Sequence, residues 1–304
     1  MSNGKTLLTV VVLTRDEALH LSRLVASFEG LPCRFVIVDS GSTDGTGDVA
    51  RELGADVYVH PFETHARQFN WALDNILIET PWTMRMDADE YLLPELTDEL
   101  TRVLQDAPDN VGGWVVRRRM VFWGRWIRHG GYYPTWLLRV WRTGSGRIEA
   151  RFMDEHVVLA AGEVRRLKHD IVDENHKGLG FWTDKHNRYA NREVLDLLGM
   201  NTDDAEVRRP VGQAGLRRSL KLSLYIRAPL FLRALLFWIY RYFFRLGFID
   251  GRAGLVFIFL QTFWYRFLVD AKLYEHKLCK ETALFQKRNC SEMAPSSKKS
   301  GKTE

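Results

Sequence analysis

An α/β fold is predicted for the first part of this 304-residue chain, with a parallel sheet covered by helices on both faces. Short runs rich in β-branched residues alternate there with helical patterns, as in sheets whose strands are joined by crossover helices. The apolar share of 46% and the charged share of 27% are those of a folded protein. Acidic residues recur directly after the predicted strands, at the edge where open parallel sheets bind ligands.

The strands and helices of this region follow one another at short intervals. Four strands are expected at residues 7–13, 34–38, 56–59 and 82–86. Helices are expected at residues 17–28, 43–53 and 66–78 and from Pro94 onward. Gly54 suits the end of the second helix, and Pro94 suits the first turn of the fourth, where a backbone N–H would have no helical partner.

The remainder of the chain has a different pattern. Residues 111–158 are strand-rich and hold five tryptophans, most of which we expect in the core. A helix is expected near residues 181–198, a polar linker at 199–215 and a strongly apolar helical region at 216–274. The Ser/Lys-rich tail from residue 291 is expected to be disordered.

The charge distribution points to an anionic partner. The net charge is only +5, but residues 111–151 hold nine arginines and one acid. Residues 208–252 hold ten basic residues and one acid. Phosphate groups, acidic lipid and nucleic acid all fit such blocks. Three scattered cysteines indicate a reducing compartment without a disulfide framework, and the first residues show no secretory signal, so we expect a cytoplasmic protein.

Three carboxylates are crowded after the fourth predicted strand. Asp87 and Asp89 are separated by one residue, and Glu90 follows directly. Like charges this close repel, and a hard divalent cation relieves the repulsion because it prefers carboxylate oxygens. Asp16 and Glu17 after the first strand and Asp39 after the second reach the same sheet edge. A solvated turn or helix cap explains any one of these acids, but it explains their coincidence poorly.

The loop at residues 39–46 excludes two common phosphate-binding classes. It has no Gly-Lys-Ser/Thr sequence and no Gly-x-Gly-x-x-Gly at the helix entry, and the loop after the first strand has no glycine. P-loop nucleotide hydrolases and dinucleotide dehydrogenases are therefore disfavoured.

Three motifs carry a resemblance to a known family. They are VVLTRDE at 11–17, VDSGSTDGT at 38–46 and DADE at 87–90. In this order and spacing they resemble family 2 glycosyltransferases with the GT-A fold, a Rossmann-like mixed sheet flanked by helices. The resemblance covers roughly residues 7–200. Within the family it is similar to bacterial enzymes that extend lipopolysaccharide cores and exopolysaccharide repeats.

The resemblance implies a UDP-sugar site with Mg²⁺ or Mn²⁺ as the cofactor. Donor contacts are implied for the uracil, ribose and diphosphate by Thr14, Glu17, Asp39, Ser42, Asp44, Arg67 and Asp87. Asp87 and Asp89 are the implied metal ligands, and Asp173 stands where many GT-A enzymes have a histidine ligand. His169 and His176 are the alternatives to Asp173 as third ligand.

The family's reaction also requires a base that takes a proton from the acceptor hydroxyl. The resemblance points to the segment 152–158, where Glu155 is the first choice, Asp154 the second and His156 the third. Apolar neighbours would raise a carboxylate pKa toward the working pH. The alternative is a hydrogen-bonded turn between strands.

Arginines near the tryptophans are the expected contacts to an acceptor that carries phosphate. Those assigned to the acceptor are Arg117, Arg119, Arg125 and Arg139. Arg118 and Arg128 lie in the same stretch.

The apolar C-terminal region is expected to lie on a membrane surface. Its longest uncharged run, residues 253–265, is 13 residues, whereas spanning a bilayer needs about 20. On a helix, Arg227, Arg241 and Arg245 fall near one face with Arg233 about 120° away, which is typical of an interfacial anchor on anionic lipid. A helical hairpin packed on the catalytic domain or in a dimer interface is the alternative.

These observations predict four regions. They are a nucleotide-sugar-binding half at 1–110, an acceptor-binding half at 111–200, a helical membrane-interface region at 201–285 and a disordered tail at 286–304. The predicted function is an inverting, metal-dependent transfer of sugar from UDP-sugar to a lipid-linked or phosphate-bearing glycan, in bacterial surface polysaccharide biosynthesis at the cytoplasmic face of the inner membrane.

Three alternatives stay open. A sugar nucleotidyltransferase of related fold would require a glycine-rich basic loop after the first strand. A catalytically inactive membrane adaptor would not require the acid set. A nucleic-acid-binding protein would require a recognisable module, and none is present in the sequence, so no nucleic-acid partner is expected. The sequence leaves the oligomeric state open.

Overall fold

A computed structural model describes residues 6–149, 156–198 and 228–292. Its centre is one mixed sheet in the order β3-β2-β1-β4-β8-β6-β11-β5, with β7 paired to β6. The predicted α/β class is therefore confirmed. The first four strands are parallel neighbours, namely β1 (Leu8–Thr14), β2 (Cys33–Asp39), β3 (Asp56–Val59) and β4 (Trp82–Asp87).

The second half of the chain extends the same sheet. Its strands are β5 (Glu90–Leu92), β6 (Val111–Phe122), β7 (Arg125–Trp126), β8 (Thr135–Arg142) and β11 (Glu163–Glu174). β8 runs antiparallel to both β4 and β6, whereas β11 runs parallel to β6. A separate pair is formed by β9 (Gly146–Ile148) and β10 (Val157–Leu159). The predicted boundary near residue 110 therefore divides one continuous sheet.

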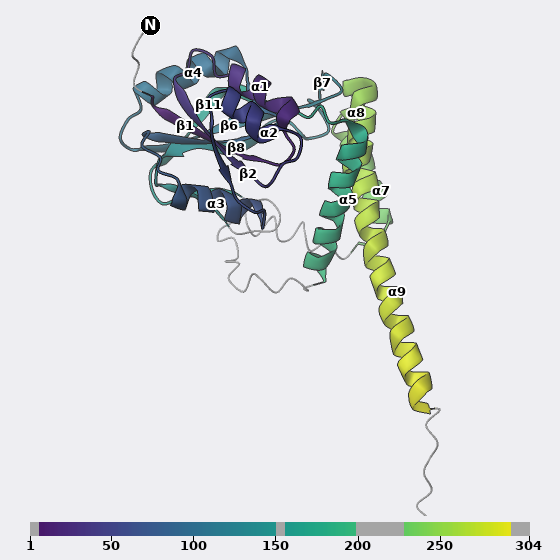
Figure 1. Cartoon of the computed structure of the whole chain (residues 1–304). Helices are drawn as coiled ribbons and strands as arrows, with labels where there is room; N and C mark the ends of the chain where they lie inside the picture. The colour runs from purple at the N-terminus through teal and green to yellow at the C-terminus, as the bar shows by residue number, and fades with distance from the viewer. Residues whose placement is uncertain (1–5, 150–155, 199–227, 293–304) are drawn as a thin grey trace, which may run out of the picture.

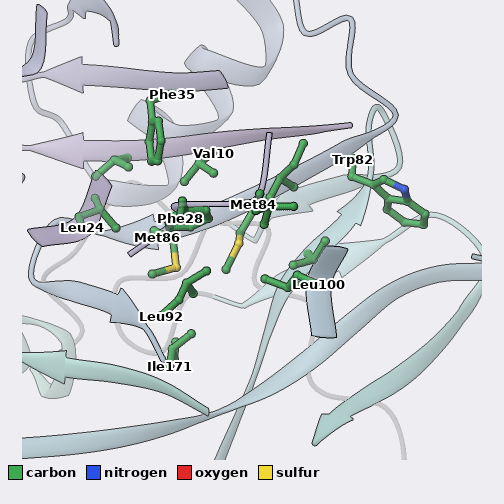
Figure 2. Close-up of a cluster of buried hydrophobic side chains, with 14 of the residues drawn as sticks. Val10, Leu24, Phe28, Phe35, Trp82, Met84, Met86, Leu92, Leu100 and Ile171 are labelled. Carbon is green, nitrogen blue, oxygen red and sulfur yellow. The ribbon is translucent and has the colours of Figure 1, made fainter. Parts of the chain in front are cut away.

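Helices cover both faces of the sheet (Figure 1). Side chains alternate along β1, so Val10 and Val12 pack beneath α1 (Ala18–Ala26), α2 (Thr46–Glu52) and α4 (Pro94–Gln105). Val11 points to the other face, under α3 (His65–Asn75). Figure 2 shows the larger core, in which Met84, Met86 and Trp82 of β4 lie among side chains from several elements.

The C-terminal helices form a second body beside the far end of the sheet (Figure 1). They are α5 (Gly178–Leu197), α7 (Leu232–Ile239), α8 (Gly251–Ile258) and α9 (Tyr265–Glu292), with single π-helical turns η1 (Tyr240–Phe244) and η3 (Phe259–Trp264) and a 3₁₀ turn η2 (Gly247–Asp250). Ala190 and Val194 of α5 pack on Tyr265 and Val269 of α9. Ile127, beside β7, packs on Phe257 of α8, which joins the two bodies.

Two features of the C-terminal region were not expected from the sequence. α9 continues to Glu292, so residues 286–292 are helical where disorder was predicted. The helical segment Gly247–Lys280 is long and apolar enough to cross a membrane by length and composition, a test that core helices of soluble proteins also pass. The uncharged run of 13 residues is shorter than the apolar helical segment, because the helix continues through the π turn into α9.

The predicted basic face of this region is wrong for Arg233 and Arg241. Arg233 is only 5% exposed and forms a buried ion pair with Asp270 of α9, which also accepts from the Phe231 backbone N–H at 2.8 Å. Arg241 donates to the Gly130 carbonyl at 2.6 Å, and the Arg245 guanidinium lies beside Gly131. Arg233 is therefore used inside the helical body and Arg241 joins η1 to the loop at Gly130, whereas Arg245 is exposed. Arg227 lies outside the described residues.

Candidate active site

The strand-end acids meet at the carboxyl edge of the parallel strands. The register pairs Thr14 with Asp39 and Leu13 with Asp87, so the ends of β2, β1 and β4 lie side by side. Thr14 is 2% exposed, and its hydroxyl finds no hydrogen-bond partner within the described parts of the chain. A buried hydroxyl without a partner is uncommon and is expected where a ligand supplies one.

Asp87 is held by a buried arginine. Arg139 of β8 is 4% exposed and donates to Asp87 Oδ2 at 3.1 Å and to Glu90 Oε1. One guanidinium therefore serves two acids. Burial raises the pKa of Glu90 to about 8 despite Arg139, and Asp87 adds to that rise. Desolvation opposes ionisation of Asp87 as well, but Arg139 and Arg85 hold its pKa far below its ordinary value, which leaves Asp87 charged.

Asp89 is fixed from the end of β11. The Asn175 side-chain amide donates to Asp89 Oδ2 at 2.9 Å, and the Glu174 N–H donates to the Asp89 carbonyl at 3.1 Å. Asp173 of β11 lies 3.3 Å from the Arg118 guanidinium. Burial raises the pKa of Asp173 to about 6, and the neighbouring Asp89 and Asp87 raise it further against the effect of Arg118. Asp173 is therefore buried close to two other carboxylates.

These acids fit a divalent cation only in part. Within the described ranges, no three His, Cys, Asp or Glu side chains converge closely enough to form a metal-binding group. The predicted set of Asp87, Asp89 and Asp173 is therefore not assembled, since Arg118 holds Asp173. Asp87 and Asp89 remain a suitable pair of oxygen donors. Mg²⁺ commonly binds through one or two carboxylates and completes its shell with phosphate and water.

A cavity of about 540 Å³ joins these acids to the C-terminal helices. Its charged part combines the three aspartates with four basic side chains, namely His65, Arg85, Arg118 and Lys185. Its apolar part is lined by Phe122 and Trp123 of the β6–β7 hairpin, Phe181 and Trp182 of α5, and Phe257 of α8. The cavity thus offers charge at one part of its wall and aromatic surface at another.

Lys185 of α5 is a cavity residue that sequence reasoning missed. No described carboxylate lies within ion-pairing distance of its ammonium group, although Asp89, Asp173 and Asp87 are near enough to raise its pKa against the effect of burial. Arg85, which lies 3.7 Å from Asp87, was missed too, although it stands two residues before the motif. Nothing in the sequence indicates that α5 returns to this edge of the sheet.

Several residues predicted to bind the nucleotide sugar instead form hydrogen bonds within and between the loops after β1 and β2. Both Asp39 carboxylate oxygens accept from the Ser42 N–H, at 3.1 and 2.9 Å. The Ser42 hydroxyl accepts from the Asp16 N–H at 2.7 Å, and Asp44 accepts from the Ala18 N–H at 3.1 Å. These bonds tie the two loops together. Ser42 and Asp44 do not line the cavity described above.

Glu17 lines the cavity but already has two side-chain partners. Its carboxylate pairs with Lys177 at 2.5 Å and with His20 Nδ1 at 2.7 Å. Arg67 of α3 lies on the exposed surface, 2.8 Å from Glu63, and is not among the residues that line the cavity. Arg85 is therefore better placed than Arg67 for a phosphate in this cavity.

The prediction of which arginines contact the acceptor needs correction. Arg117 and Arg119 of β6 both pair with the buried Asp170, and their side chains point to the sheet face opposite Arg118, which lines the cavity. Arg139 is buried beneath Asp87 and is out of an acceptor's reach. Arg125 is exposed and approaches the Ile249 carbonyl at 3.4 Å. Alternation along the strand thus selects Arg118 from this arginine-rich stretch.

The predicted base lies outside the described residues. Asp154 and Glu155 fall between β9 and β10, which pair Ile148 with Val157. His156 is described; it is exposed, and its carbonyl accepts from the Glu149 N–H at 3.0 Å. The assignment of the base stays a prediction.

Comparisons with known proteins find relatives that are similar to part of this chain. A lipopolysaccharide core biosynthesis glycosyltransferase, LpsC of Rhizobium meliloti, is 32% identical over 152 residues, 47% of this chain and 53% of the relative. An uncharacterized glycosyltransferase of Rickettsia felis is 34% identical over 93 residues, 31% of this chain and 32% of the relative. The matches thus span between about a third and a half of these relatives.

Solved structures with a similar chain path include glycosyltransferases. A mannosyltransferase of Pyrobaculum calidifontis, in complex with GDP-Man and Mn²⁺, superimposes with a TM-score of 0.46 at 14% identity, covering 90% of this chain and 88% of that one. TarS of S. aureus gives 0.44 at 13% identity, covering 89% and 92%. The model of glycosyl transferase family 2 matches residues 9–175, which carry the acids, Arg139 and all but the first residue of the mixed sheet. The chain belongs to glycosyl transferase family 2.

Proposed function

We propose that this protein is an inverting, divalent-metal-dependent glycosyltransferase that moves a sugar from a UDP-sugar to a lipid-linked or phosphate-bearing glycan in bacterial surface polysaccharide biosynthesis. One observation supports it most directly. A single cavity holds Asp87 and Asp89 together with Arg85, Arg118 and Lys185. This mixture of carboxylates and cations suits a nucleoside diphosphate bound through a metal, and the match to LpsC suggests the glycan class.

The chemistry follows from the charge that develops on the leaving group. The acceptor hydroxyl oxygen forms a bond to the anomeric carbon, the bond from that carbon to the phosphate oxygen breaks, and its electron pair leaves with UDP. A bound Mg²⁺ or Mn²⁺, held by Asp87 and Asp89, would neutralise part of the diphosphate charge. Lys185 and Arg85 add fixed positive charge in a partly closed cavity, where it stabilises the leaving group more than it would in water.

The acceptor hydroxyl is proposed to transfer its proton to a carboxylate on the β9–β10 connection. Glu155 is the proposed base and Asp154 the second choice. A single displacement requires only this one base and inverts the anomeric centre. Asp173 is too well held by Arg118 to be proposed as a metal ligand, and we assign it to positioning that arginine.

The C-terminal body is proposed to place the enzyme at the cytoplasmic face of the membrane, as a monotopic protein. Its outer surface carries large apolar side chains that the protein leaves uncovered, namely Leu236, Tyr240, Phe243, Phe244, Phe248 and Ile249. An apolar patch of this kind on a soluble surface marks a contact site. Because α5 and α8 also form the cavity wall, an acceptor held in the bilayer would reach the site along these helices.

Calorimetric titration tests the donor site. UDP-glucose, UDP-galactose and UDP-N-acetylglucosamine are titrated with and without Mn²⁺, and we expect one of them to bind with strong metal dependence. Lys185→Met should weaken that binding about tenfold or more, the effect of losing roughly 1.5–3 kcal/mol from a hydrogen bond to a charged group. Lys168→Met, which removes an exposed lysine of β11, is the matched control. Equal affinity in Lys185→Met would remove Lys185 from the site, and no binding of any nucleotide sugar would favour the inactive adaptor.

A further inference from the structure

The turn between β6 and β7 carries a residue that folding disfavours. Phe122 pairs with Arg125, so Trp123 and Gly124 alone make the turn, and both have positive φ, 53° and 69°. Two-residue hairpin turns of this form favour Asn-Gly or Asp-Gly. A bulky side chain at positive φ is strained, so tryptophan at this position calls for a reason other than the turn itself.

Trp123 also differs from the other tryptophans of its segment. It is 60% exposed, whereas Trp114 is 4% exposed and Trp141 is fully buried. Trp126 and Trp136 are half-buried and are covered by arginines, with Arg119 4.4 Å from the Trp126 ring. Trp123 is therefore the one tryptophan of this segment whose ring is mainly open to solvent.

The Trp123 ring belongs to the cavity wall and is firmly supported. It lines the cavity that holds Asp87 and Asp89. The Phe122 ring stacks on it, with centroids 4.7 Å apart and planes 27° apart, and Phe122 in turn packs on Phe257 of α8 at 5.3 Å. The hairpin thus presents a supported aromatic surface where the cavity opens.

We propose that Trp123 is a stacking platform for a sugar ring of the acceptor, at the opening of the active-site cavity. The C–H face of a pyranose is apolar and its edge is polar, so it suits a flat, rigid indole that is partly open to water. The charged part of the cavity is assigned to the donor, which leaves the aromatic part for the acceptor. This inference rests on the proposed glycan acceptor. An exposed tryptophan could also anchor in a membrane interface, but Trp123 lines the cavity, and that favours the sugar.

The variant Trp123→Asn removes the ring without loss of the turn, because Asn-Gly is the preferred turn sequence. We expect the melting temperature to be unchanged or raised. The KM for lipid-free lipopolysaccharide core oligosaccharide should rise about tenfold, equivalent to roughly 1.4 kcal/mol of binding, while the KM for the UDP-sugar is unchanged. Trp123→Tyr should restore most of the acceptor affinity. Leu77→Asn, which changes a 73% exposed apolar residue away from the cavity, is the control.

A direct binding measurement separates this inference from the proposed function. The protein is labelled with 5-fluorotryptophan, and the Trp123 fluorine signal is assigned by its loss in Trp123→Asn. Added core oligosaccharide should shift that signal whether or not transfer is detected, whereas failure of every UDP-sugar to bind would contradict only the proposed function. An unshifted Trp123 signal would overturn the platform. Loss of binding to phosphatidylglycerol vesicles in Trp123→Asn, with an unchanged KM for the oligosaccharide, would assign the ring to the membrane instead.

Discussion

The strand-end acids and the C-terminal arginines are both charged groups that stand out in the sequence, and the structure uses them in opposite ways. Asp87 and Asp89 open into a cavity beside basic groups. Arg233 and Arg241 turn inward, the first to a buried aspartate and the second to a backbone carbonyl. The acids remain available to a ligand, whereas these arginines serve the packing of the helices.

The difference follows from what fixes each position. A residue at the end of a parallel strand must reach the sheet edge, because the register with its neighbours allows no other place, as the pairing of Leu13 with Asp87 shows. A residue on a helix face points to solvent or to protein according to which element docks there. The sequence pattern of Arg233 and Arg241 fixed their spacing but could not reveal α9 or the loop at Gly130 as partners.

The strongest test of the acids is Asp89→Asn. We expect transfer to fall by about a thousandfold, since removing a group that stabilises the leaving charge costs roughly that much. The variant keeps the amide contact from Asn175, so the fold should be unchanged. Steady-state transfer with the UDP-sugar and Mn²⁺ measures the effect. Asp48→Asn, at an exposed acid of α2, is the control, and an Asp89→Asn enzyme with full activity would contradict the metal assignment.

The arginines are tested through the partner of Arg233. Asp270→Asn leaves the guanidinium buried beside a neutral group and should lower the free energy of unfolding by about 3–5 kcal/mol. Urea denaturation in mild detergent measures it. The double variant Arg233→Met/Asp270→Leu should recover most of the loss, because it removes both charges from the interior. If Asp270→Asn were as stable as the parent, the ion pair would contribute little and Arg233 could face lipid after all.

The same contrast explains how much could be predicted from the sequence. β-branched runs predicted β1 and β2, and a short apolar run predicted β4, each to within one or two residues; the strand ends predicted Asp39, Asp87 and Asp89. The short strand β5 and its pairing to β11 were not predicted, because three residues carry no periodicity. Those pairings bring Asp173 and Asn175 to Asp89, so the far wall of the site could not be predicted.

The face of the sheet to which each arginine of β6 points was also known only from the structure. The sequence pointed to Arg117 and Arg119 because arginines cluster there, yet Asp170 neutralises one face of β6 and leaves Arg118 on the other. Lys185 was missed for a similar reason, since its role depends on where α5 packs and not on its neighbours in the chain.

The smallest expected effect is that of salt concentration on binding to membrane vesicles. A basic face would bind phosphatidylglycerol vesicles strongly at about 0.05 M salt and weakly at about 0.5 M, where charges are screened over a few ångströms. Because Arg233 and Arg241 are used inside the protein and the exposed surface is aromatic, we expect binding to fall by less than about threefold over this range. Vesicle sedimentation measures it.

The matched comparison replaces the aromatic side chains themselves. Phe243→Ser/Phe244→Ser removes two exposed rings, 51% and 76% accessible, each of which would gain roughly 1.5–3 kcal/mol on entering lipid. Sedimentation with vesicles should fall at least about tenfold at either salt concentration. Arg252→Gln, at an exposed cation of α8, should change little. A steep loss of binding with salt in the parent, with no effect of the double serine variant, would restore the electrostatic anchor and show that the C-terminal charges act as the strand-end acids do, on a partner outside the chain.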